Sequence, residues 1–119
     1  MKNEDDQFLY NLSFEKEDAG DDFGALSIRK RLYDKNNEDI YFIVALGKSY
    51  EKLGRYQIAE SYYRKAIEQY PKSEMASLHL YNLLVDDKKM NLALDELERY
   101  MSVSTSEIYL EKLARFKNL

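Results

Sequence analysis

The chain has 119 residues, no cysteine and a formal net charge of −4, which fits one domain and excludes disulfides, thiolate metal sites and thiol nucleophiles. Residues 1–24 carry eight acidic side chains and two lysines, whereas the remainder carries fourteen acidic and sixteen basic side chains. Neither part forms the basic stripe that phosphate binding needs, so no nucleic-acid partner is expected. No apolar run could cross a bilayer and the polar N-terminus has no signal-peptide core, so we expect a soluble cytoplasmic protein without a membrane partner.

Seven helices are predicted along the chain, and none of the segments between them alternates as a strand would. The expected ranges are 5–17, 21–35, 38–53, 56–70, 74–86, 89–103 and 106–117. The connecting stretches DAGDD, KNNED and DDKK are rich in residues that favour turns and helix caps. The predicted fold class is all-α.

The third and fourth helices form the clearest unit. Apolar residues recur at three- and four-residue steps on one face of each helix: Ile40, Ile43, Leu46, Tyr50 and Leu53, then Tyr56, Ala59, Tyr63, Ala66, Ile67 and Tyr70. Gly54 is expected to end the first helix in a left-handed cap, and Pro71 stops the second. Gly47 and Ala59 are small enough for a close helix contact and are expected to face each other.

This unit repeats every 34 residues. Ala25, Ala59 and Ala93 share the register, and Gly20 corresponds to Gly54. Three units fit in the chain, and a last helix begins a fourth, with Ser104 and Glu107 expected as its capping box. A repeat of this length predicts a solenoid in which each unit buries the face of its neighbour.

The middle unit resembles the tetratricopeptide repeat. The residues that carry the resemblance are Leu46, Gly47, Tyr50, Gly54, Tyr56, Ala59, Tyr63, Ala66 and Pro71, with Ile43 where a tryptophan is usual. The third unit keeps Leu80, Ala93 and Leu97, whereas the first keeps Gly20 and Ala25 and has Arg29 in an aromatic slot. The resemblance implies a single domain over residues 1–119, a right-handed α-solenoid of three helix pairs and a C-terminal capping helix. The repeats are expected at about 6–39, 40–73 and 74–107, and the closing helix at about 106–117.

The resemblance also implies a non-enzymatic interaction module, a scaffold, adaptor or chaperone-like protein that binds a peptide or helix of a partner protein. The concave groove is expected on the first helix of each pair, where exposed apolar and aromatic side chains suit an interface. The expected groove residues are Tyr10, Phe14, Tyr41, Val44, Lys48, Met75, Leu78, Asn82 and Tyr109. Lys48 and Asn82 would fix a peptide backbone or an acidic side chain.

Some members of this family hold the terminal carboxylate of a heat-shock chaperone with lysine, asparagine and arginine on successive first helices. The corresponding slots in this chain hold Tyr10, Phe14, Ala45, Met75 and His79 or, one repeat further on, Val44, Lys48, His79, Tyr109 and Leu113, and only Lys48 fits in either register. These mostly apolar groups cannot form the converging charged donors of such a clamp. We therefore expect no clamp of this kind.

Nothing in the sequence suggests catalysis, a cofactor or a metal. His79 is the only histidine, the adjacent Asp86 and Asp87 fit a helix end, and no glycine-rich phosphate loop is present. Two other hypotheses stay open: an inhibitor or immunity protein that binds a folded partner, such as a toxin, on its convex back, and a self-assembling structural protein. Weak self-association is left open as well.

Overall fold

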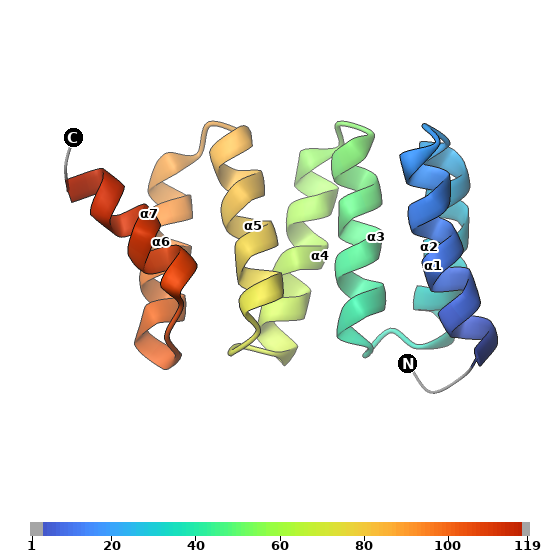
Figure 1. Ribbon diagram of the computed structural model, residues 1–119, viewed down its shortest axis with the longest axis horizontal. Coiled ribbons are helices and arrows are strands. Elements are labelled where there is room, and N and C mark those ends of the chain that lie inside the picture. Colours follow the sequence, from blue (N-terminus) through green and yellow to red (C-terminus); the bar gives the residue numbers. More distant parts are fainter. Residues whose placement is uncertain (1–3, 118–119) are drawn as a thin grey trace.

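The structure, a computed structural model, describes residues 4–117, and within that range it contains seven helices and no strand. The helices are α1 (Glu4–Asp18), α2 (Asp22–Lys35), α3 (Ile40–Lys52), α4 (Tyr56–Gln69), α5 (Glu74–Asp86), α6 (Met90–Val103) and α7 (Glu107–Lys117). They stand side by side in a row from α1 to α7 (Figure 1), and the molecule measures 46 × 27 × 21 Å. The all-α prediction is confirmed, and every described helix end lies within about two residues of its predicted place.

The helices pack in pairs, and each pair packs on the next. α1 contacts α2, α3 contacts α4 and α5 contacts α6, while α2 lies against α3 and α4 against α5. α3 also contacts α5 directly, so first helices of successive pairs are neighbours. This arrangement places one side of α1, α3 and α5 on a common surface.

The turns inside the pairs have the same backbone geometry. Gly20, Gly54 and Lys88 have positive φ angles of 84°, 75° and 61°, and they are spaced 34 residues apart. Glycine adopts this left-handed conformation without steric cost, whereas a residue with a Cβ atom does not. Lys88 therefore holds the place of a third turn glycine, which the sequence pattern did not reveal.

The three register alanines, Ala25, Ala59 and Ala93, are fully buried, as the 34-residue period predicts. The prediction that Gly47 faces Ala59 was wrong, because Gly47 lies against Tyr63 instead. A Cβ atom on Gly47 would lie 2.6 Å from the ring of Tyr63, and its three nearest neighbours are all atoms of that ring. Gly47 is needed because a large aromatic side chain, rather than a small one, crosses α3 at this point.

Side-chain caps set several helix starts. Asp21, Asp39 and Ser73 accept hydrogen bonds from backbone amides in the first turns of α2, α3 and α5. The expected cap of α7 at Ser104 was wrong. Ser104 instead ends α6, with its amide donating to the carbonyl of Tyr100, and Ser106 accepts the amide of Tyr109 at 3.1 Å.

Candidate functional site

The expected groove residues come from α1, α3, α5 and α7, and the structure separates them by burial. Tyr41 and Asn82 are exposed, whereas Tyr10, Phe14, Lys48, Met75 and Leu78 are partly buried. Val44 and Tyr109 are buried in the core, with exposed fractions of 4% and 0%. Val44 and Tyr109 therefore cannot line an open surface, and their assignment to the groove is corrected.

Aromatic rings from α1 and α3 contact one another on the shared surface. The ring centroid of Tyr10 lies 5.0 Å from that of Phe14, 6.3 Å from Tyr41 and 6.1 Å from Phe42. The contacts with Phe14 and Tyr41 are edge-to-face, a favourable arrangement at these distances, and the contact with Phe42 is tilted. We call Tyr10, Tyr41, Met75 and Leu78 the apolar edge, because they occupy the N-terminal halves of the first helices.

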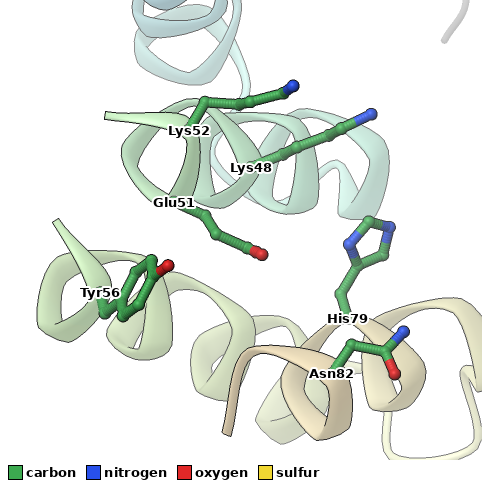
Figure 2. A pocket seen from close by; sticks show the side chains of 6 residues that line it. All are labelled: Lys48, Glu51, Lys52, Tyr56, His79 and Asn82. Atoms are coloured by element: carbon green, nitrogen blue, oxygen red, sulfur yellow. The ribbon is translucent and has the colours of Figure 1, made fainter. Parts of the chain in front are cut away.

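A pocket of about 400 Å³ lies on the same surface, toward the C-terminal ends of α3 and α5 (Figure 2). Its lining residues are Lys48, Glu51 and Lys52 from α3, Tyr56 from the start of α4, and His79 and Asn82 from α5. Figure 2 shows the carboxylate of Glu51 and the ring of His79 directed into the space between the helices. We call this hollow the polar pocket, since all six lining side chains carry polar atoms.

Lys48 is held in place from the side of α1. Its ammonium lies 3.1 Å from a carboxylate oxygen of Glu17 and 5.2 Å from the ring centroid of Phe14. About a third of its side chain is still exposed, so it can also face the polar pocket. Lys48 thus links the polar pocket to the first helix pair.

Glu17 belongs to a buried network around Arg29, whose side chain is fully buried. Arg29 donates from Nε to Ser13 at 3.0 Å and from Nη1 to Glu17 and Ser49, both at 2.9 Å. The guanidinium carbon lies 4.5 Å from the ring centroid of Phe14. The network joins α1, α2 and α3 through one side chain, and a buried charge of this kind needs such partners.

The sequence places Arg29 in an aromatic slot but gives no partner for it. Counting 34 residues forward, Ser13 and Arg29 correspond to Gly47 and Tyr63, and Glu17 corresponds to Glu51. The hydroxyl of Tyr63 donates to Glu51 at 2.7 Å, just as Arg29 donates to Glu17. The first repeat therefore replaces a glycine–tyrosine contact by a serine–arginine contact and keeps the glutamate acceptor.

The buried groups have shifted pKa values with distinct causes. Burial alone would raise the pKa of Glu17, but the hydrogen bonds from Arg29 and Lys48 outweigh it and lower the pKa. Burial raises the pKa of Glu51, which the hydrogen bond from Tyr63 only partly offsets. Burial and the nearby Lys48 charge lower the pKa of His79, so its neutral form is favoured. At neutral pH the imidazole of His79 on the α5 side of the polar pocket is therefore neutral.

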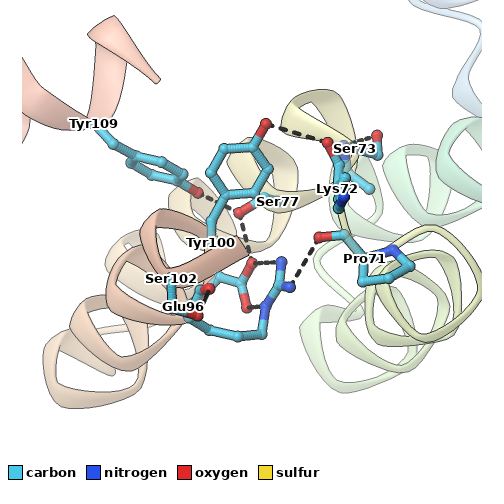
Figure 3. A network of polar contacts seen from close by, with 10 residues as sticks. Pro71, Lys72, Ser73, Ser77, Glu96, Tyr100, Ser102 and Tyr109 are labelled. Carbon is cyan, nitrogen blue, oxygen red and sulfur yellow. Dashed lines mark hydrogen bonds and ion pairs between the residues drawn. The ribbon is translucent and has the colours of Figure 1, made fainter. Parts of the chain in front are cut away.

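Tyr109 takes part in a second network, which attaches α7 to α5 and α6 (Figure 3). Its hydroxyl lies 2.6 Å from that of Ser77, and Ser77 donates to Glu96 at 2.5 Å. Since a serine hydroxyl has one proton, Tyr109 is the donor to Ser77. Arg99 donates to both carboxylate oxygens of Glu96, at 2.8 and 2.7 Å. Tyr109 is therefore an anchor for the last helix, which explains its burial.

Within residues 4–117 no group of three or more histidine or acidic side chains could hold a metal ion. No helix in the same range is long and apolar enough to span a membrane. The polar side chains gathered on the shared surface can form hydrogen bonds and ion pairs.

Known proteins share this fold and one of its repeats. Residues 41–73 match the tetratricopeptide repeat family. No curated protein sequence is significantly similar to the chain. Among solved structures, the chaperone SycD of Yersinia enterocolitica in complex with a peptide of the translocator YopD is 19% identical, with a TM-score of 0.76 over 94% of this chain and 86% of SycD.

Two further structures agree with this. MamA from Desulfovibrio magneticus RS-1 is 24% identical, with a TM-score of 0.74 over 86% of this chain, which spans 58% of the MamA chain. The first repeat domain of Spaghetti (RPAP3), bound to the HSP90 peptide SRMEEVD, is 14% identical, with a TM-score of 0.77 over 95% of this chain and 93% of that chain. Residues 41–73 thus match the tetratricopeptide repeat, and the chain as a whole shares the helical-solenoid fold of these structures.

Proposed function

We propose that the chain is a non-enzymatic interaction module that binds a peptide or helical segment of a partner protein on the surface formed by α1, α3 and α5. The observation that carries the proposal is the apolar edge beside the polar pocket. Tyr41 is 46% exposed although it lies on a central helix of the row. Exposed aromatic side chains beside polar groups are typical of interaction sites.

The geometry favours a segment over a folded domain. The polar pocket is a hollow of about 400 Å³ between neighbouring helices, a size that admits side chains. SycD and Spaghetti (RPAP3), which share the fold, were each solved with a peptide. We expect an affinity on the order of micromolar for a short segment. On the sequence grounds given above, we propose a cytoplasmic protein.

The test compares two double variants in capture of partners from the native host. Tyr41→Ala with Leu78→Ala removes apolar groups from the proposed surface. Ile58→Ala with Leu92→Ala is the matched control, because these residues are 40% and 41% exposed on the second helices α4 and α6. All variants are first melted to confirm an intact fold.

The proposal requires that a captured partner, once purified, binds the control variant like the parent and binds the Tyr41→Ala, Leu78→Ala variant at least tenfold more weakly. The opposite pattern would move the binding surface to α4 and α6, as the inhibitor or immunity hypothesis expects. Equal binding to both variants would exclude the apolar edge.

A further inference from the structure

The charges around the polar pocket are not balanced by its own lining. Lys48 and Lys52, one helical turn apart on α3, are two cations among the six lining side chains, and Glu51 is the only carboxylate. Lys52 is exposed; it forms no salt bridge among residues 4–117 and acts on Glu51 only through space. Lys48 shares its partner Glu17 with Arg29, so one buried carboxylate faces two cations.

The acidic groups near the polar pocket are already engaged or lie outside it. Glu51 accepts a hydrogen bond from the hydroxyl of Tyr63 at 2.7 Å, from the side of the core. Asp86, one turn beyond Asn82 on α5, acts on Glu51 through space but does not line the pocket. The exposed amide of Asn82 adds a neutral donor to the two ammonium groups. The pocket therefore offers several donors for one more carboxylate.

The position of the apolar edge indicates a second feature of the bound segment, an apolar side chain near the acidic one. Tyr41 and Lys48 are seven residues apart on α3, which is about 10 Å along the helix axis. An extended peptide covers this distance in about three residues. A segment that contacts both places needs an apolar and an acidic side chain at roughly this separation.

We infer that the polar pocket receives an aspartate or glutamate side chain of the bound segment, between Lys48, Lys52 and Asn82, while an apolar residue of the same segment contacts the apolar edge. The inference rests on the proposed function and specifies the partner as an acidic segment with an apolar residue nearby. We propose a side-chain carboxylate because Lys48 is the only suitable donor in the slots used for terminal carboxylates, so the converging set of charged donors is incomplete.

The experiment is a peptide selection on the whole chain. Random peptides of roughly twelve residues, long enough to cross the row of first helices, are displayed with their C-termini fused to the carrier. We expect enrichment of Asp or Glu with an apolar residue about two to four positions away. An enriched sequence is then synthesised with an amidated C-terminus and, separately, as the free acid, and binding is measured by fluorescence anisotropy.

Lys52→Gln should weaken binding of the amidated peptide about five- to tenfold, the loss of one charge-assisted hydrogen bond at a partly exposed site. Lys72→Gln is the matched control, because Lys72 is an exposed lysine in the loop between α4 and α5. It should change binding less than twofold. Raising the salt concentration from about 50 to about 500 mM should weaken binding of the amidated peptide to the parent more than to the Lys52→Gln variant.

Several results would overturn the inference. A side-chain carboxylate in the polar pocket would be rejected if the enriched peptides lacked acidic residues. It would also be rejected if acidic peptides bound the Lys52→Gln variant as tightly as the parent, or if only the free acid bound. The proposed function would survive these results if Tyr41→Ala with Leu78→Ala still abolished binding. No enrichment above a blank surface, or equal binding to that double variant, would reject both.

Discussion

The buried Arg29 network allows a quantitative test of what holds the first helix pair to the second. Glu17→Gln removes the one carboxylate of residues 4–117 that accepts from Arg29, yet it keeps the size of the side chain. Arg29 is fully buried and cannot turn to water. Breaking one partner of a buried pair leaves an uncompensated charge and costs about 3–5 kcal/mol.

For a chain of this length, 1 kcal/mol corresponds to about 4 °C in Tm. We therefore expect Glu17→Gln to lower Tm by about 12 °C or more, measured by circular dichroism together with urea unfolding. The hydrogen bonds lower the folded-state pKa of Glu17 below 4.5, so its stabilising effect is present above that pH and is lost as the pH falls through the folded-state pKa. The difference between parent and variant should shrink in acid.

The second repeat supplies a rescue. Ser13→Gly with Arg29→Tyr copies the contact of Gly47 with Tyr63 into the first repeat, and Glu17 can accept the new hydroxyl as Glu51 does. The free energy of unfolding of this double variant should lie within about 1 kcal/mol of the parent's, because the buried charge of Arg29 is replaced by the aromatic ring found at the corresponding position of the second repeat. A Tm for Glu17→Gln within about 2 °C of the parent would refute the reasoning that Arg29 depends on Glu17.

Four further predictions concern stability and binding. Lys88→Gly should raise the free energy of unfolding by about 0.5–1 kcal/mol in urea unfolding, because it relieves a left-handed backbone that glycine tolerates; an unchanged or lower value would contradict the assigned turn. Ala59→Leu should cost about 1–3 kcal/mol at a fully buried helix contact, and a Tm like the parent's would show that the contact tolerates a larger side chain. The lowered pKa of His79 should make stability fall as the pH drops below 6.5, and His79→Gln should lack this component in acid melts. The peptide SRMEEVD should bind no better as the free acid than as the amide, measured by anisotropy, and a clear preference for the free acid would restore the clamp.

The helix ranges and the turns could be predicted because local chemistry decides them. Gly54 and Pro71 limit their helices through the backbone alone, and the alanine register follows from a repeated close contact. The burial of Val44 could not be predicted in this way. α3 contacts α2, α4 and α5, so residues 42–47 are all buried and the buried arc is wider than the apolar stripe indicates.

The burial of Tyr109 and the partners of Arg29 could not be predicted for a similar reason. Tyr109 shares its register with the exposed Tyr41, but its surroundings include Ser77 and the ring of Tyr100, which become neighbours only after folding. The partners of Arg29 come from three helices. A sequence pattern shows that a position faces inward, whereas the identity of its neighbours depends on how the helices are arranged.

The different chemistry of the repeats makes the two ends of the molecule respond differently to solvent. An apolar cluster extends from Ile43 on α3 to Tyr109 on α7, and none of its buried members comes from α1 or α2. The N-terminal pair is joined to α3 by the aromatic contacts of Tyr10 and by the buried ionised groups Arg29 and Glu17. In a row of repeats each unit depends mainly on its nearest neighbour. In acid, protonation of Glu17 should therefore weaken the contact of the N-terminal pair with α3, while the apolar cluster between α3 and α7 stays folded. Unfolding at low pH should then begin at the N-terminal end.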